Sequence, residues 1–316
     1  MQSTGGASLT LTLPKAWISR LKLRSKDEVL VNDSGPVLVI RPADKAKQEV
    51  AIDIAVDDAP NEWFIREMIG AYIAGADKIA LRSHRITPSQ NQAIRQAVQL
   101  LFGFEILEET SQKIVARTVL DDAMFPVSES TLRIFVIVRS MFADSLKAAQ
   151  TGDKDLANDI KLRDYEVNKL LHAIKRQFQQ ISSGKIEGNL EEVSFYRSVA
   201  IQLERIGDHA VKIAGLAGTD RTEPVKLSST FPTIQKRANQ LLKDAEAMVR
   251  GLDKSQAHNI LDSDKELERL IYGSKHMKQS YEGALIEDSL DRLRGYLMNI
   301  AELTIDYTFV SSTQKP

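Results

Sequence analysis

The sequence contains no cysteine and no long apolar run. Without cysteine among its 316 residues, the chain cannot form disulfides, thiolate nucleophiles or Cys-ligated zinc, which leaves Asp, Glu and five His as candidate metal ligands. The longest apolar run, residues 134–138, is far shorter than the roughly 20 residues that span a bilayer, and the N-terminus has no signal-peptide pattern. The sequence therefore predicts a cytoplasmic protein without a membrane span.

The chain also has almost no net charge, but its charge is unevenly distributed. The total is −1, whereas residues 1–47 hold eight Lys and Arg against four Asp and Glu, a balance of +4. The remainder, 34 against 39, carries −5. A basic segment ahead of an acidic body indicates an anionic partner at the N-terminus. With 43% hydrophobic and 27% charged residues, a chain of this length is expected to form two or three globular domains.

Residues 1–47 are predicted to form a small β-rich domain. Apolar and polar residues alternate from Ser8 to Leu13, which is typical of a half-buried strand, and a short helix is expected over residues 15–23. Two apolar runs, residues 28–31 and 37–40, flank the turn residues 33–36 and indicate a β-hairpin. So few apolar side chains cannot close a core alone, and we expect a homodimer.

Three landmarks in this segment resemble the AbrB/SpoVT family. They are Gln2 to Ser8, Leu13-Pro14-Lys15, and Lys26 to Val29. The resemblance implies an interlaced, swapped-hairpin dimer that binds DNA. The basic residues that usually precede this pattern are missing before Gln2, so we expect either an upstream start or a lower DNA affinity.

Four basic residues of this segment are candidates for contact with DNA phosphates, which is independent of base sequence and sensitive to salt. They are Lys15, Arg20, Lys22 and Arg24. The alternative is that they form a solvated surface with no ligand.

Residues 48–122 are predicted to form a small α/β domain in the order strand, helix, strand, helix, strand, strand. The expected elements are residues 50–56, a helix capped by Asn61 and ending at Ala74, residues 78–82, a helix opened by Thr87-Pro88, and residues 104–107 and 114–119. No glycine-rich loop, metal-ligand spacing or nucleophile constellation occurs in it, and His84 stands alone as a surface residue. We expect a spacer or sensing role and no enzyme activity.

Residues 123–316 are predicted to be helical throughout, which makes the protein mainly α. Breaks near residues 151, 183, 218–232 and 283 divide the segment into about six helices. An internal repeat is visible, because Asp164 to Leu170 returns as Asp264 to Leu270 at an offset of 100. Leu203-Glu204-Arg205-Ile206 returns as Leu290 to Leu293 at an offset of 87. The segment therefore consists of two three-helix repeats, at about 127–220 and 230–310.

The first repeat contains a long motif, Glu204 to Val211, and an Asp-x-x-Val-Asn element at Asp164 to Asn168. These residues resemble the PhoU family, and a PhoU-like bundle behind an AbrB-like head resembles the archaeal-type PhoU regulators. The resemblance implies a role in phosphate uptake and binding of metal through Glu/Asp-x-x-x-Asp elements. Glu204 and Asp208 are the residues here that match such an element.

The spacing of these carboxylates supports a cation site. An apolar stripe on the same helix faces the core, and Glu204 and Asp208 lie off it on a second face, where Asp164 of the neighbouring helix can approach. Three carboxylates favour a hard divalent cation such as magnesium or manganese, with iron as a further candidate. The alternative is that Asp208 pairs with Lys212 at the protein surface. The second repeat keeps one carboxylate, Asp291, but has Gly295 and Tyr296 in place of Asp208 and His209.

Two functions fit the sequence. The first is a phosphate-responsive transcriptional regulator that binds DNA through the head. The second is an adaptor that inhibits the phosphate ABC transporter by protein contact, with the head serving only to dimerise.

Overall fold

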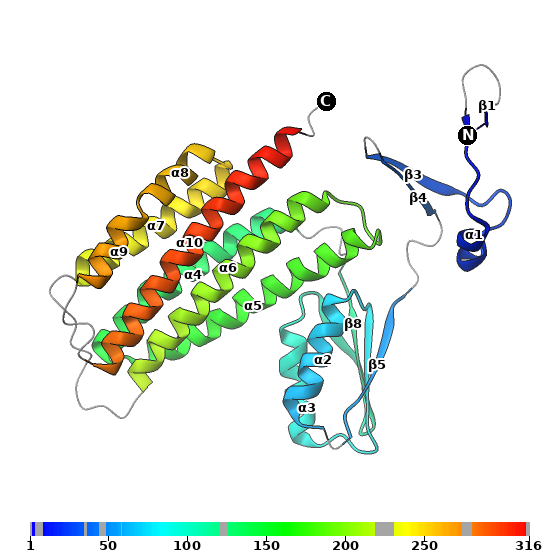
Figure 1. Cartoon of the computed structure of the whole chain (residues 1–316). Coiled ribbons are helices and arrows are strands. Elements are labelled where there is room, and N and C mark those ends of the chain that lie inside the picture. The colour runs from blue at the N-terminus through cyan, green and yellow to red at the C-terminus, as the bar shows by residue number, and fades with distance from the viewer. Residues whose placement is uncertain are drawn as a thin grey trace. The chain divides into compact units, whose positions relative to one another are not determined.

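The computed structural model describes residues 2–3, 9–34, 37–43, 49–57, 59–120, 126–218, 231–273 and 280–313. The chain divides into two compact units, residues 1–49 and residues 50–316 (Figure 1). Within the described ranges, no helix is both long and apolar enough to cross a membrane. The protein is mainly helical, with a small strand-rich N-terminal unit, as predicted.

The N-terminal unit has the predicted order of strand, helix and hairpin. Its elements are β1 (Gln2–Ser3), β2 (Leu9–Thr10), α1 (Lys15–Leu21), β3 (Val29–Ser34) and β4 (Val37–Pro42). Strands β3 and β4 pair antiparallel, whereas the turn residues between them lie outside the described part. The strand predicted to reach Leu13 is too long. Strand β2 ends at Thr10 because its partner β1 has only two residues, and Leu11 beyond it is 57% exposed.

The second unit begins with a four-stranded sheet in the order β5-β6-β8-β7, with β5 and β6 parallel and the other pairs antiparallel. Helices α2 and α3 cover one face of this sheet (Figure 1). The elements are β5 (Ala51–Ala55), α2 (Asn61–Ile73), β6 (Lys78–Arg82), α3 (Pro88–Gln99), β7 (Phe104–Glu109) and β8 (Lys113–Thr118). The predicted order of strands and helices is therefore confirmed.

A side-chain cap explains where α3 begins, whereas α2 begins without one. Thr87 accepts a hydrogen bond from the Gln90 backbone, and the Gln90 side chain accepts one from Thr87, which completes a capping box ahead of α3. The predicted cap at Asn61 is wrong. Pro60 occupies the cap position of α2 without a side-chain bond, and Asn61 is the first helical residue, whose amide donates to Ser89 Oγ at 3.1 Å.

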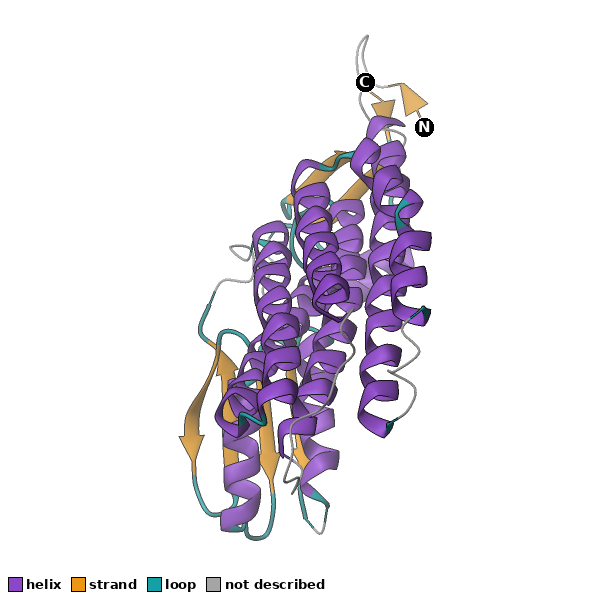
Figure 2. Cartoon of the chain, turned by 90° about the vertical axis from the view of Figure 1, so that its left-hand side faces the viewer, coloured by secondary structure: helices purple, strands orange, loops and turns teal. Residues whose placement is uncertain are grey.

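The rest of the second unit is a bundle of long helices (Figure 2). They are α4 (Val127–Thr151), α5 (Lys154–Ser182), α6 (Leu190–Gly215) with a 3₁₀ turn at Leu216–Gly218, α7 (Phe231–Gly251), α8 (Lys254–Asp262), α9 (Asp264–Tyr272) and α10 (Tyr281–Thr313). Two expectations need correction. No break was predicted between residues 232 and 283, but this stretch contains α7, α8 and α9, which are separated at Leu252-Asp253 and at Ser263. Gly283, where a break was predicted, lies inside α10, and the preceding helix already ends at Tyr272.

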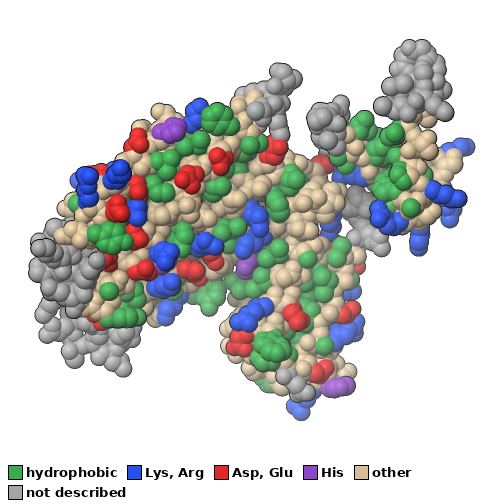
Figure 3. Space-filling model, viewed as in Figure 1, with side chains coloured by type: hydrophobic (Ala, Val, Ile, Leu, Met, Phe, Trp, Pro, Cys, Tyr) green, Lys and Arg blue, Asp and Glu red, His purple; other side chains and the backbone are tan. Residues whose placement is uncertain are grey.

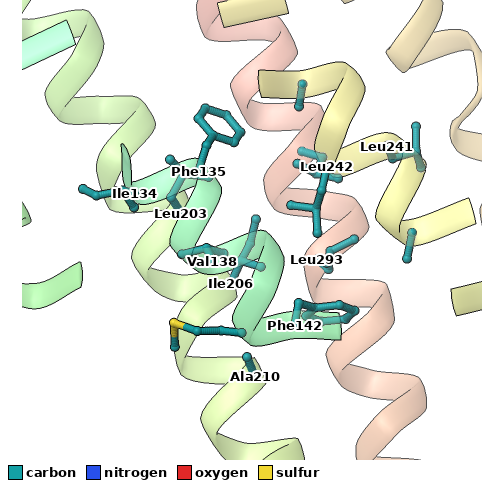
Figure 4. Packing of buried hydrophobic residues seen from close by; sticks show 14 of the residues in the cluster. Ile134, Phe135, Val138, Phe142, Leu203, Ile206, Ala210, Leu241, Leu242 and Leu293 are labelled. Atoms are coloured by element: carbon teal, nitrogen blue, oxygen red, sulfur yellow. The ribbon is translucent and has the colours of Figure 1, made fainter. Parts of the chain in front are cut away.

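Both predicted repeats contribute to one hydrophobic core. The stripe predicted on α6 is fully inside it, and the same core includes residues of α4, α7 and α10 (Figure 4). Labelled members are Ile134, Phe135, Val138, Phe142, Leu203, Ile206, Ala210, Leu241, Leu242 and Leu293. Burial of these apolar faces is the main force that assembles the helices.

One buried arginine joins the bundle to the α/β part of this unit. Arg176 of α5 is 2% exposed, and its guanidinium donates to the backbone oxygens of Tyr72 and Ala76 at 2.8 and 2.6 Å. It also lies over the ring of Tyr72, at 4.9 Å from the centroid. Nearby, Lys185 forms an ion pair with Asp77 at 2.7 Å. Because a buried charge must keep its partners, these contacts fix α5 against α2.

Candidate functional site

The four basic residues predicted to contact DNA surround α1. Lys15 begins the helix, Arg20 lies in its last turn, Lys22 is its left-handed C-cap at φ 53°, and Arg24 follows two residues later. All four are exposed, and none forms an ion pair within the described part of the chain. Figure 3 shows Lys and Arg side chains gathered on this unit. The side chains are available to an anionic surface, and contact with DNA stays a prediction.

The unit that carries these residues shows no buried core among its described residues. Among its described side chains none is buried, and α1 in particular has no buried residue. Several large apolar side chains are instead exposed to between 39% and 61%. These are Leu11, Val29, Leu30, Val31, Leu38 and Val39. A surface of this kind on a segment of fewer than 50 residues requires a second surface to cover it.

The three predicted metal ligands are neighbours in the bundle. Asp164 lies on α5, and Glu204 and Asp208 lie one turn apart on α6, which packs along α5. At Gly207, a Cβ atom would lie 3.6 Å from Asp164 Oδ1, which places this carboxylate against the face between Glu204 and Asp208. Because that face lies beside the core stripe, as predicted, none of the three is fully buried.

Electrostatic repulsion acts between these carboxylates. Burial raises the pKa of Asp164 to about 6, and the negative charges of Asp208 and Glu204 add to the shift. Burial and the charge of Asp208 also raise the pKa of Glu204. Asn168 donates to Asp164 Oδ2 at 3.0 Å, but Asp164 Oδ1 is buried without a hydrogen-bond partner. A positive charge or a proton at this point would relieve the repulsion.

The donor set fits a hard cation, because it consists of carboxylate oxygens, one of which is buried and unpartnered. The oxygens do not yet converge, since within the described ranges no three His, Asp or Glu side chains are close enough together to hold a metal ion. Asp208 is exposed and Glu204 is half-buried, so both side chains can change rotamer. If a cation bound here, Asp164, Glu204 and Asp208 would hold it.

Nearby lysines do not neutralise the cluster by direct pairing. Among the described residues, Asp208 forms no ion pair with Lys212, so the alternative pairing is not formed here. Lys175 of α5 lies near enough to Glu204 for their charges to interact, but burial lowers the pKa of this lysine. None of the three carboxylates has an ion pair within the described ranges.

His209 follows Asp208 and belongs to a contact between helices. It is 6% exposed, and its Nδ1 lies 3.1 Å from Ser289 Oγ on α10. Its ring centroid lies 6.1 Å from that of Tyr296, the residue that replaces it in the second repeat. His209 lies off the apolar stripe in the sequence, which fits either a surface residue or an inter-helix residue, and the structure shows the second.

The second repeat differs in a way that the sequence interpretation missed. Asp264 of α9 and Asp291 of α10 both contact the guanidinium of Arg294: Nη1 donates to Asp264, and Nη2 lies 2.9 Å from Asp291 Oδ1. The offset of 87 residues contained this signal, because it aligns Arg294 with Gly207.

Two segments of the chain match models of known protein families. Residues 131–217 match the family model described as the PhoU domain, and residues 2–48 match the model of the MazE bacterial antitoxin, described as antidote-toxin recognition. A search of curated proteins found no match.

Two solved structures resemble the fold. One is the phosphate transport system regulatory protein PhoU from Streptococcus pneumoniae, with 22% sequence identity, a TM-score of 0.51, and coverage of 58% of this chain and 93% of that one. The other is PhoU from Pseudomonas aeruginosa, with 20% identity, a TM-score of 0.51, and coverage of 58% and 96%. At these identities the likeness establishes the fold of the bundle. Residues 131–217 are therefore similar to the PhoU domain, and residues 2–48 resemble the MazE antitoxins.

Proposed function

We propose that the protein is a phosphate-responsive transcriptional regulator of phosphate uptake, which binds DNA as a homodimer through residues 1–47. In this proposal its PhoU-like bundle senses or relays phosphate or cation status. The observation that carries the proposal is the union, in one chain, of a PhoU domain with a MazE-like segment whose four basic side chains are exposed and, within the described ranges, form no ion pair.

The charge of the first unit supports contact with DNA. Phosphate contacts need flexible cationic side chains that are not already neutralised, and Lys15, Arg20, Lys22 and Arg24 meet this condition. They lie on or beside one short helix, so they can act together on one backbone. Phosphate contacts position a protein on DNA, while sequence is selected by contacts to base edges.

The exposed apolar side chains of its strands support dimerisation through the same unit. Val31 and Leu38 are 57% and 61% exposed, and they lie on the two strands of one hairpin. A second copy supplies a matching surface, and a two-fold dimer doubles the number of phosphates that the protein can touch.

The test is DNA binding at two salt concentrations. Fluorescence anisotropy would compare a fragment from upstream of the protein's own gene with a shuffled fragment of equal length. We expect tighter binding to the first, and we expect replacement of Lys15, Arg20, Lys22 and Arg24 by Gln to weaken binding to both. The slope of log K against log salt should fall by roughly 0.9 for each phosphate that the variant protein no longer neutralises.

A matched control removes basic charge elsewhere. Lys236 and Lys243 of α7 are exposed and have no ion pair within the described ranges, so Lys236→Gln with Lys243→Gln should leave DNA affinity unchanged. If the parent protein binds neither fragment, the alternative function is favoured. That alternative is an adaptor that inhibits the phosphate ABC transporter by contact, with the head used for dimerisation only.

The proposed cation at Asp164, Glu204 and Asp208 has its own test. Because the unfolded chain cannot hold these carboxylates together, a bound cation stabilises the folded state by mass action. We expect chelator to lower the melting temperature of the parent, and we expect Glu204→Gln with Asp208→Asn to abolish this effect. A surface pair without a ligand predicts no chelator effect and a change of less than about 0.5 kcal/mol for the double variant.

A further inference from the structure

The two halves of the bundle carry corresponding acidic pairs. Asp164 corresponds to Asp264 at the offset of 100, and Glu204 corresponds to Asp291 at the offset of 87. The core confirms the second register, because the corresponding residues of α6 and α10 are all 0% exposed. These pairs are Leu203 with Leu290, Ile206 with Leu293, Ala210 with Leu297, and Ile213 with Ile300.

The two repeats carry different residues at the position that lies between the two corresponding carboxylates. In the second repeat it is Arg294, whose guanidinium contacts both Asp264 and Asp291 and whose side chain is 18% exposed. In the first repeat it is Gly207, and neither Asp164 nor Glu204 has an ion pair within the described ranges. One repeat therefore contains its own positive charge, and the corresponding position of the other carries no side chain.

Arg294 lies among acidic residues, and its positive charge reduces the repulsion between them. Asp264 and Asp291 are 27% and 30% exposed, and Glu287, one turn before Asp291, is 7% exposed. Without Arg294, Asp264 and Asp291 would lie near one another at the junction of α9 and α10 without the positive charge that now contacts both. Like charges in a partly buried site repel strongly, and a fixed cation removes that repulsion.

We infer that Arg294 is a built-in cation, which occupies in the second repeat the place that a divalent cation would take in the first. The bundle then has one repeat whose charge balance is permanent and one whose charge balance depends on an added ligand. The assignment of a ligand-dependent charge balance to the first repeat rests on the proposed cation at Asp164, Glu204 and Asp208. The role of Arg294 rests only on the contacts that Arg294 makes.

The geometry at Gly207 allows the arginine of the second repeat to be introduced at the corresponding position of the first repeat. Arg294 follows Asp291 by three residues, and Gly207 follows Glu204 by three residues. A Cβ at Gly207 would have its nearest contacts at 3.6 and 3.7 Å, with Asp164 Oδ1, Met141 and Val138, which is ordinary van der Waals contact. An arginine at position 207 can therefore begin without a clash and extend toward the same two carboxylates.

The experiment measures the melting temperature of the full chain in chelator and in an excess of MnCl₂. Removal of one partner from a mostly buried ion pair is destabilising, so Arg294→Ala should lower the melting temperature in chelator by about 3–6 °C. Manganese should then recover at least half of this loss, in addition to any effect that it has on the parent. An equal response to manganese in the parent and in Arg294→Ala would overturn the inference.

The reciprocal variant is Gly207→Arg. It should raise the melting temperature in chelator and remove the response of the parent to manganese. If the parent shows no such response, the proposed cation site in the first repeat fails, while the result for Arg294→Ala still decides the role of Arg294.

Two further variants separate charge from packing. Arg292→Ala is the matched control, because Arg292 is 61% exposed and its ion pair with Asp288 is long, at 3.9 Å; it should change neither the melting temperature nor the response to manganese. The triple variant Asp264→Asn, Asp291→Asn and Arg294→Met removes all three charges of the second repeat, and it should fold with a response to manganese no larger than that of the parent. If both Arg294→Ala and the triple variant fail to fold with or without manganese, Arg294 acts by packing alone and the inference is wrong.

Discussion

The N-terminal unit and the second unit differ in how far they bury their apolar side chains within one chain. Residues 1–49 contain strands and a helix, but none of their described side chains is buried. Residues 50–316 bury apolar side chains from every long helix of the bundle, and a second core lies between the sheet and helices α2 and α3. The difference shows that regular secondary structure alone does not make a stable domain. The first unit exposes apolar side chains that a second surface would cover, whereas the second unit buries its two cores within the single chain.

Removal of residues 1–47 has the largest expected effect on assembly. The mass measured by light scattering should change from that of a dimer to that of a monomer, because the exposed strands that require a partner are gone. The melting temperature of the remaining body should stay within about 2 °C of the parent, since its core is intact. A truncated chain that remains dimeric would place the interface in the second unit.

A matched pair of core substitutions sharpens the same comparison. Ile206 is 0% exposed, and Ile206→Ala should lower the free energy of unfolding of the body by about 2–5 kcal/mol at any protein concentration. Leu38 is 61% exposed in the single chain. We expect Leu38→Ala to weaken the dimer, so its effect should appear as a shift in the concentration at which the dimer dissociates. Analytical ultracentrifugation over a dilution series would separate the two behaviours.

The buried arginine of α5 tests whether the second unit unfolds as one body. Arg176→Met keeps an unbranched side chain but cannot donate to the Tyr72 and Ala76 backbone oxygens. We expect the free energy of unfolding to fall by about 1.5–3 kcal/mol, because hydrogen bonds made by a charged group are removed from a buried site. Calorimetry should then resolve separate transitions for the α/β part and the bundle. A single transition at the parent's temperature would contradict this role.

The smallest expected effect depends on pH. Burial lowers the pKa of His172, and the nearby charge of Lys175 acts in the same direction, while a contact with the Leu100 carbonyl opposes the shift. The unfolded chain therefore takes up a proton first as the pH falls below about 6.5, and the body loses stability there by at most about 1.4 kcal/mol per pH unit.

His172→Gln should flatten this part of the profile of stability against pH, measured by chemical denaturation from about pH 5 to about pH 7.5, on either side of the ordinary histidine pKa. The flattening should be incomplete, because burial also lowers the pKa of His209. A profile of unchanged slope in His172→Gln would show that His172 is not protonated differently in the two states.

Local patterns predicted most of the elements because their causes are local. The alternation from residue 50, the helix start at Thr87-Pro88 and the helical stripe of α6 each depend on neighbours within a few residues. The errors arose where a boundary depends on distant parts of the chain. Strand β2 is short because its partner is short, and Asn61 begins α2 without capping it while bonding to Ser89.

The candidate sites also contain some features that local sequence patterns could predict and others that depend on distant residues. The positions of Asp164, Glu204 and Asp208 on adjacent helix faces followed from helical spacing, and in the structure their charges interact although, within the described ranges, their oxygens do not converge on one point. The exposure of Lys15, Arg20, Lys22 and Arg24 followed from their charge. The coupling of Arg176 to the α/β layer could not be predicted, since its partners lie about 100 residues away.

Periodicity, offset and composition are properties of the chain, and they were enough to establish the two repeats, the acidic pairs and the unequal distribution of charge. Which of those charges are neutralised depends on how the helices pack. The guanidinium of Arg294 reaches Asp264 because α9 and α10 pack together. Among the described residues, the carboxylates around Gly207 have no ion pair because the corresponding position has no side chain. Charge balance depends on distances of a few ångströms between helices, and packing sets those distances.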